Sequence, residues 1–182
     1  KQKYLPAMAA GEKIGCFALS EPGAGSDATN LSTTAVKKGD KWILNGTKHF
    51  ITNGPIADVF TVFAVTDKEK GAKGGITSFL VERDFPGLKI GAIDKKMGLR
   101  GSKTSQVIFD NCEVPEENVI GEVGMGYMSA LKILSEGRIG LAARAVGACE
   151  KLIELSAKYA QERVQFGQPI AKNQAIQWML AD

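Results

Sequence analysis

The sequence predicts an α+β protein in which an antiparallel β-barrel or sandwich is followed by the long helices of a bundle. Between residue 14 and about residue 115, apolar residues fall in short runs separated by turn signals, with no helical pattern between them. Such spacing is typical of antiparallel β structure. From Gly126 onward, apolar residues recur three and four positions apart. This second period indicates amphipathic helices.

The β half contains several predicted strands in order. The stretch TTAVKKGDKWILNGTKHFITNG carries two hairpin signals, Gly39-Asp40 and Asn45-Gly46, because both pairs suit turns that need positive φ. The Val, Phe and Thr content of residues 58–66 predicts a buried strand. The run ITSFLVER is expected to follow as another strand, and residues 105–114 alternate until Pro115.

The helical half begins with one long predicted helix. Its period continues from Gly126 almost to Phe166, so the helix would be on the order of 50 Å long. QFGQPI is expected to form a loop, and a second helix is expected to start near Asn173. Two helices cannot enclose a core of their own, so we expect further helices or a partner chain. The start without methionine and the end inside a helical pattern suggest a cut through a longer chain.

Composition excludes several classes of protein. The net charge of +3, with 44% hydrophobic and 24% charged residues, is ordinary for a soluble globular protein. The basic cluster at residues 68–73 is diluted by Asp67 and Glu69 and has no aromatics, so we predict a solvated loop and no nucleic-acid partner. Cys16, Cys112 and Cys149 are far apart and His49 is the only histidine, which disfavours a zinc site and predicts free, buried thiols in a reducing compartment. The sequence shows no signal peptide and no membrane span.

The stretch SEPGAGSD, residues 20–27, could be a tight turn or a loop that holds a ligand. It is not a dinucleotide fingerprint, because the third glycine of that motif would fall at Ala28 and the following residues read as strand. It is not a P-loop, because no GK[ST] follows. On glycine content alone a tight turn is the simpler interpretation.

Five segments read together change that interpretation. SEPGAGSD, NGTKHFITNG, MGLRGSKT, EGRIGLAARAVG and ERVQFGQPI follow one another across nearly the whole chain. This ordered set resembles the acyl-CoA dehydrogenase family. The resemblance implies that residues 1–13 end an N-terminal helical domain, residues 14–121 form the middle β-domain, and residues 122–182 begin a C-terminal helical bundle.

The resemblance also implies an FAD site and an acyl-CoA site. Backbone groups near Leu19 and Ser20 would meet the isoalloxazine edge, Phe50 would pack on the ring where the family more often has tryptophan, and the Thr52 hydroxyl would reach the flavin N5 region. An arginine at position 163 suits pyrophosphate, although it could also be a helix-end charge. The residues implied to contact FAD are Phe17, Leu19, Ser20, Gly25, Ser26, Phe50, Ile51 and Thr52, with Arg163, Phe166 and Gln174 reaching the FAD of a neighbouring subunit. Those implied to contact the substrate are Ser26, Ser135 (where aspartate is more frequent) and Arg138.

The implied reaction is α,β-desaturation of an acyl-CoA thioester, with electrons passing to an electron-transfer flavoprotein. Some branches of the family place the catalytic base immediately before the helix arginine, but here that position is Gly137. Glu136 lies about 100° away around the helix, so we predict that the 182 residues contain no catalytic base. Short acyl chains, a homodimer or homotetramer, and a bacterial cytoplasmic or mitochondrial matrix location are further implications. A flavin oxidase or monooxygenase of the same fold, or a non-catalytic β module, stays open as an alternative.

Overall fold

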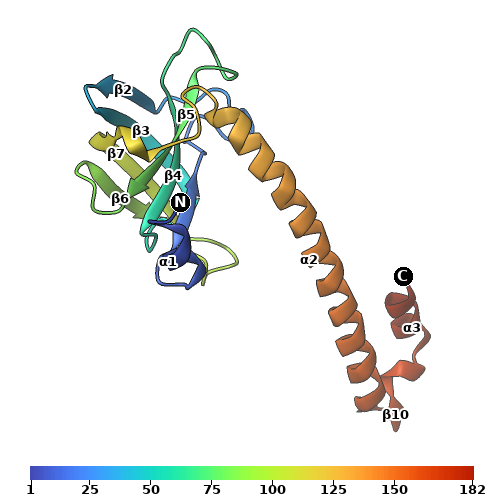
Figure 1. The fold of residues 1–182 in the computed structure, drawn as a ribbon. Helices are drawn as coiled ribbons and strands as arrows, with labels where there is room; N and C mark the ends of the chain where they lie inside the picture. The colour runs from blue at the N-terminus through green and yellow to red at the C-terminus, as the bar shows by residue number, and fades with distance from the viewer. The chain divides into compact units, whose positions relative to one another are not determined.

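A computed structural model describes all residues from Lys1 to Asp182 as two compact units, Lys1–Leu131 and Lys132–Asp182. The first unit contains a short helix, α1 (Leu5–Ala9), and one eight-stranded sheet (Figure 1). Its strands are β1 (Gly15–Ala18), β2 (Thr34–Lys38), β3 (Lys41–Thr52), β4 (Val59–Val65), β5 (Ile76–Glu82), β6 (Leu88–Ile93), β7 (Thr104–Pro115) and, after the 3₁₀ turn η1 (Glu116–Asn118), β8 (Val119–Ile120).

The sheet is open. Its strands follow the order β6-β7-β3-β2-β4-β5-β8, and β1 pairs with β4 from beside this path. Most neighbours are antiparallel, whereas β4 runs parallel to both β1 and β2. The α+β class is confirmed, but β6 and β8 end the sheet without pairing to each other, so no closed barrel forms.

Of the two predicted hairpin turns, one is confirmed and one is wrong. Gly39-Asp40 joins β2 to β3, with Lys38 opposite Lys41 and Gly39 at φ +62°. Asn45-Gly46 is not a turn, because β3 continues through it to Thr52 and shifts register against β7 by a β-bulge. A Cβ added to Gly46 would lie 2.6 Å from the Thr33 Cα. The glycine is therefore needed for a close approach between chain segments.

Two clusters of buried apolar side chains lie on the sheet. The larger cluster includes Leu44, Phe60 and Val114, and the smaller one includes Leu19 and Phe63. The strand predicted at 58–66 is β4. All of its residues except Thr61 and Val65 are buried, as its composition indicated. Leu19, in the segment that follows β1, thus packs against Phe63 of the sheet.

The second unit is helical with a small hairpin. Most of it is the long helix α2 (Gly126–Glu162), which confirms the predicted helix. The predicted loop QFGQPI instead forms part of a hairpin, β9 (Val164–Gln165) and β10 (Gln168–Pro169), followed by the 3₁₀ turn η2 (Ile170–Lys172). Phe166 and Gly167 both have positive φ, as a two-residue type I′ turn requires. The second predicted helix is α3 (Gln174–Ala181).

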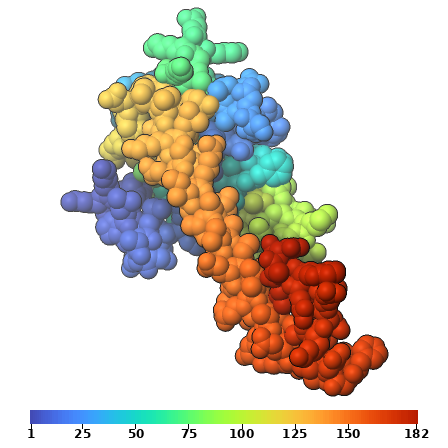
Figure 2. Space-filling view, turned by 90° about the vertical axis from the view of Figure 1, so that its right-hand side faces the viewer, coloured from blue at the N-terminus to red at the C-terminus, as the bar shows by residue number.

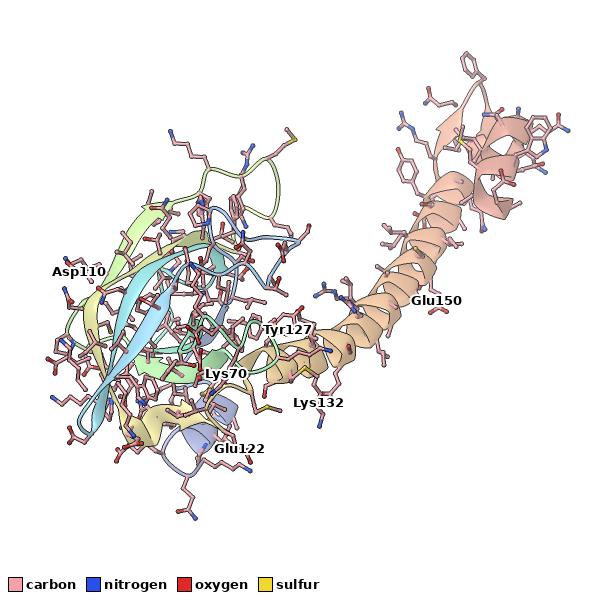
Figure 3. The ribbon with its side chains drawn as sticks, turned by 90° about the horizontal axis from the view of Figure 1, so that it is seen from above. Lys70, Asp110, Glu122, Tyr127, Lys132 and Glu150 are labelled. Atoms are coloured by element: carbon pink, nitrogen blue, oxygen red, sulfur yellow. The ribbon has the colours of Figure 1, made fainter.

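The C-terminal residues gather around the last turns of α2 (Figure 2), where Leu155, Tyr159, Ile176 and Met179 line one shared hollow. Every residue of α2 between Leu131 and Glu150 is exposed, and side chains stand out from the helix around Glu150 (Figure 3). Ile139, Leu141 and Val146 are among its exposed apolar side chains. Cys149 lies on this stretch, so the expected burial of the cysteines is confirmed for Cys16 and Cys112 and wrong for Cys149. No helix in the structure combines the length and apolar character needed to cross a membrane.

Candidate functional site

The segment after β1 lies against β3, which brings two of the predicted site segments together. The His49 N–H donates to the Ser20 carbonyl over 2.9 Å. One residue earlier on β3, the Lys48 ammonium donates to the Leu19 carbonyl over 3.1 Å. Leu19 and Ser20 are thereby fixed beside the strand that continues to Phe50 and Thr52.

A buried ion pair lies beneath this junction. Lys48 Nζ is 2.8 Å from Glu21 Oε1, and the two side chains are 0% and 1% exposed. The other Glu21 oxygen accepts hydrogen bonds from the Ser32 N–H and hydroxyl, both at 2.6 Å, and Oε1 also accepts from the Thr33 N–H. Glu21, the first of the two acidic residues of SEPGAGSD, is therefore fully hydrogen-bonded inside the protein, as a buried charge requires.

The environment of the pair keeps both groups charged at neutral pH. Burial alone would raise the pKa of Glu21, but the Lys48 charge and the donors of Ser32 and Thr33 outweigh it and lower that pKa to about 2. Burial lowers the pKa of Lys48 to about 8, against the opposing effect of the Glu21 carboxylate.

The pair also sets the direction of a backbone donor. In a planar trans peptide the C=O and the N–H point in opposite directions. Because the Leu19 carbonyl points to Lys48, the N–H of Ser20, in the same peptide, points away from Lys48. No acceptor within the chain takes this N–H, so it is available to a ligand.

Phe50 is an exposed aromatic residue in a strained conformation. Its φ is +58° and its side chain is 64% exposed. Bulky residues rarely adopt positive φ, and where they do, the site is often functional. The ring stacks on His49, with centroids 4.0 Å apart and planes 6° apart. His49 Nε2 in turn lies 3.2 Å from Asp94 Oδ1, and Asp94 Oδ2 accepts a hydrogen bond from the Thr104 hydroxyl. These contacts hold the imidazole on which the Phe50 ring stacks.

The other predicted residues of the first unit differ in their exposure. Gly25, Ser26 and Thr52 are exposed, so they are open to a ligand. Phe17 is half-buried and packs against Phe63, with ring centroids 4.9 Å apart. Ile51 is buried in the larger core cluster, so only its backbone could meet a cofactor.

The remaining predicted residues belong to the second unit. Ser135 and Arg138 lie on the exposed length of α2, Arg163 follows its end, Phe166 is the turn of the hairpin, and Gln174 begins α3. All five are exposed.

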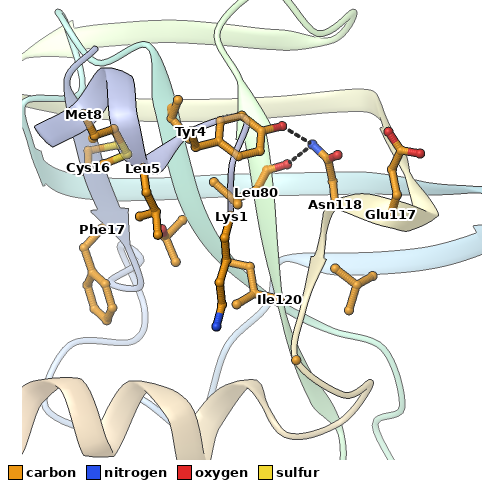
Figure 4. A pocket seen from close by; sticks show the side chains of 15 residues that line it. Lys1, Tyr4, Leu5, Met8, Cys16, Phe17, Leu80, Glu117, Asn118 and Ile120 are labelled. Atoms are coloured by element: carbon orange, nitrogen blue, oxygen red, sulfur yellow. Dashed lines mark hydrogen bonds between the residues drawn. The ribbon is translucent and has the colours of Figure 1, made fainter. Parts of the chain in front are cut away.

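A hollow of about 730 Å³ lies elsewhere in the first unit (Figure 4). Tyr4, Leu5, Met8 and Ile120 are among its lining residues, and Phe17 is the only predicted site residue there. Asn118 closes one side, where its amide donates to the Leu80 carbonyl over 2.7 Å. The hollow has no paired acid and base and no catalytic constellation, so we place the candidate site at the junction of Ser20 with β3.

Comparison with known proteins shows to which family the chain belongs. Residues 16–112 match the family model described as "Acyl-CoA dehydrogenase, middle domain", and residues 124–182 match "Acyl-CoA dehydrogenase, C-terminal domain". The chain belongs to the acyl-CoA dehydrogenase family.

Similar members of the acyl-CoA dehydrogenase family come from several bacteria. The chain is 50% identical over its whole length to an acyl-CoA dehydrogenase of Bacillus subtilis and covers 48% of that protein. It matches all of its residues to 47% of butyryl-CoA dehydrogenase from Megasphaera elsdenii, with 45% identity and a TM-score of 0.93. It also matches 47% of a chain in the structure described as the electron transferring flavoprotein of Acidaminococcus fermentans, with 51% identity and a TM-score of 0.94. The chain therefore spans about half the length of the relatives it matches.

One similar solved structure, 40% identical with a TM-score of 0.93, is described as an FAD-dependent dehydrogenase, and the junction is chemically suited to FAD. A flavin ring is planar and has a polar edge. The first unit offers a flat exposed ring at Phe50, an unpaired N–H at Ser20 and an exposed hydroxyl at Thr52. An aromatic face and a small number of placed polar groups are what such ligands require.

The sequence reasoning missed Glu21, Lys48 and the support of His49 by Asp94. One signal could have found the buried lysine. In β3 the buried positions Trp42 and Leu44 alternate, and the same period places Lys48 on the buried side of the strand. A lysine at a buried strand position requires an acidic partner, but the alternation does not say which acid supplies it, and the loop at residues 20–27 holds both Glu21 and Asp27.

Proposed function

We propose that the protein containing this chain is an FAD-dependent acyl-CoA dehydrogenase that desaturates short acyl-CoA thioesters at the α,β position. The observation that carries the proposal is the junction of Leu19 and Ser20 with β3, in a chain whose relatives include a butyryl-CoA dehydrogenase. Bound FAD would supply the acceptor for the β-hydride of the substrate.

The residues of the first unit would bind and orient that cofactor. The Ser20 N–H would donate to a flavin acceptor, the Phe50 ring would cover one face of the ring system, and the Thr52 hydroxyl would donate near N5. Ser26, on the exposed glycine-containing loop, would reach the flavin phosphates and the thioester. Backbone and hydroxyl donors of this kind suit anionic and carbonyl acceptors.

The residues of the second unit would complete the site. Ser135 and Arg138 on α2 would contact the CoA moiety of the substrate, and an arginine suits its anionic phosphates. Arg163, Phe166 and Gln174 would reach the FAD of a neighbouring subunit. Exposed apolar residues along α2 support burial against further helices and subunits, because such surfaces mark interfaces. A homodimer or homotetramer would follow.

The proposed division of the chain follows the same resemblance. Residues 1–13 would end a helical domain, residues 14–121 would form the flavin-binding β-domain, and residues 122–182 would begin the helical bundle. The catalytic carboxylate would lie outside the 182 residues. Electrons would leave for an electron-transfer flavoprotein, a partner named for one similar structure.

An anaerobic spectrum of the full-length protein, before and after addition of butyryl-CoA, tests the proposal. A flavin absorbance band that bleaches on addition is the expected result. A band that persists with butyryl-CoA and with longer acyl-CoA thioesters would contradict the substrate class. A full-length protein that carries no flavin and takes up none would overturn the proposal, and rapid reoxidation of reduced flavin by oxygen would favour an oxidase or monooxygenase.

A further inference from the structure

We infer that Lys48 is a positioning residue for the flavin site, and that Glu21 holds it in place. Lys48 fixes the peptide between Leu19 and Ser20 so that the Ser20 N–H is presented to the cofactor. The inference rests on the proposed function, because it assigns that N–H to FAD.

Stability alone does not account for this ion pair. Desolvating two charges costs about as much as their attraction returns, and replacing a buried pair by apolar side chains is often neutral or stabilising. The rest of this side of β3 is apolar, with Trp42 and Leu44 in the core cluster. What an apolar side chain at position 48 could not supply is a hydrogen bond to the Leu19 carbonyl.

Lys48 is the donor that fixes this carbonyl. Leu19 is buried and lies beyond the end of β1, so its carbonyl accepts no ladder hydrogen bond, and the Lys48 ammonium is the donor within reach. The next carbonyl, of Ser20, is held by the His49 N–H. Two adjacent residues of β3 therefore donate hydrogen bonds to two adjacent carbonyls, and these bonds fix the direction of the Ser20 N–H.

Glu21 in turn fixes the ammonium group. A lysine side chain has four rotatable bonds, so its position must be imposed from outside. The Glu21 carboxylate is held by three donors from Ser32 and Thr33 and places Lys48 Nζ at 2.8 Å. The two residues thus have different roles: Lys48 contacts the peptide that faces the cofactor, and the Glu21 carboxylate accepts hydrogen bonds from Lys48 and the Ser32–Thr33 segment.

Four variants of the full-length protein separate these roles: Lys48→Met, Glu21→Gln, the double variant, and Val114→Ala as a control. Val114 is a core residue that pairs with Trp42 near the other end of β3, so its truncation leaves a cavity without touching the Leu19 carbonyl. For each protein, FAD is removed, the dissociation constant for added FAD is measured, and the thermal midpoint and hydrogen exchange of the His49 amide are recorded without flavin.

We expect the loss of FAD affinity to follow Lys48. Lys48→Met should weaken FAD binding by about tenfold or more, which corresponds to about 1.4 kcal/mol, and should speed exchange at His49. Glu21→Gln should lower the thermal midpoint but weaken FAD binding by no more than about threefold, because a carboxamide oxygen can still accept from the Lys48 ammonium and hold it near the Leu19 carbonyl. The double variant should regain thermal stability over Lys48→Met, since no unpaired carboxylate remains buried, yet should bind FAD as weakly as Lys48→Met.

Two results would overturn the inference. One is an FAD affinity that falls in proportion to the thermal midpoint in all four variants, Val114→Ala included, because the pair would then be only structural. The other is wild-type affinity in Lys48→Met. Failure of the proposed function would look different, since the wild-type protein would then bind no flavin at all.

Discussion

Replacing Gly46 by alanine should destabilise the contact between β3 and Thr33, and should cost more stability than the same change at another positive-φ glycine. The added Cβ would lie 2.5 to 2.7 Å from the Oγ1, Cα and Cβ atoms of Thr33. Because one of these atoms is backbone, a rotamer change cannot relieve the overlap, and overpacking of this kind costs about 1–3 kcal/mol. The positive φ of +149° adds strain of about 1–3 kcal/mol. We therefore expect a loss of about 3–4 kcal/mol for Gly46→Ala.

Gly39→Ala is the matched control. Gly39 also has positive φ, at +62°, but a Cβ there would meet nothing within 4 Å. Its expected cost is only the left-handed penalty of about 1–2 kcal/mol. Hydrogen exchange of the β2 and β3 amides in the full-length protein measures the local free energy of opening for both variants. Equal losses at the two glycines would refute the argument from close approach to Thr33.

Three further predictions follow from other residues. Glu136→Gln in the full-length protein should leave turnover within about twofold of wild type, because Glu136 is an exposed helix residue, whereas a loss of several orders of magnitude in steady-state rate would make it the base. The pKa of the Glu21 carboxyl is lowered from 4.5 to about 2, so the group contributes stability above pH 4.5 that is lost as the pH falls toward 2. In Glu21→Gln the thermal midpoint should therefore fall less steeply between pH 4.5 and pH 2 than in the wild type. An equally steep fall would contradict the lowered pKa of Glu21. Phe166 is fully exposed at φ +50°, so Phe166→Asn should keep or raise the thermal midpoint while weakening FAD binding, and unchanged FAD affinity would remove Phe166 from the site.

The sequence predicted the elements whose signals are local. The Gly39-Asp40 turn, the buried β4 and the long α2 each depend on the residues within them, and all three are confirmed. Asn45-Gly46 was wrong because its glycine serves an approach to Thr33, a residue outside the strand. No pattern within β3 predicts this contact with Thr33. The sequence also could not decide between an open sheet and a closed barrel, because closure depends on whether the edge strands β6 and β8, which are distant in the sequence, pair with each other.

The candidate site divides in the same way. Family motifs singled out Ser20 and Phe50, and the structure adds what the motifs did not contain: the strained φ of Phe50 and its stacking on His49. The partnership of Lys48 with Glu21 joins residues 27 positions apart, so it becomes visible only when β3 lies beside the loop. The alternation of β3 could have placed the lysine inside, but not chosen its acid.

The order of strands in the sheet also has a consequence for synthesis of the chain. β3 lies between β2 and β7, and β7 is 52 residues farther along the sequence at their paired ends, Thr52 and Thr104. When residues up to the end of β5 have left the ribosome, Glu21 and Lys48 can already pair. One edge of the twelve-residue β3 still lacks its neighbour β7. Long unpaired edges invite association with other chains. Between the emergence of β3 and that of β7, this edge is where a ribosome-associated chaperone would protect the growing protein most.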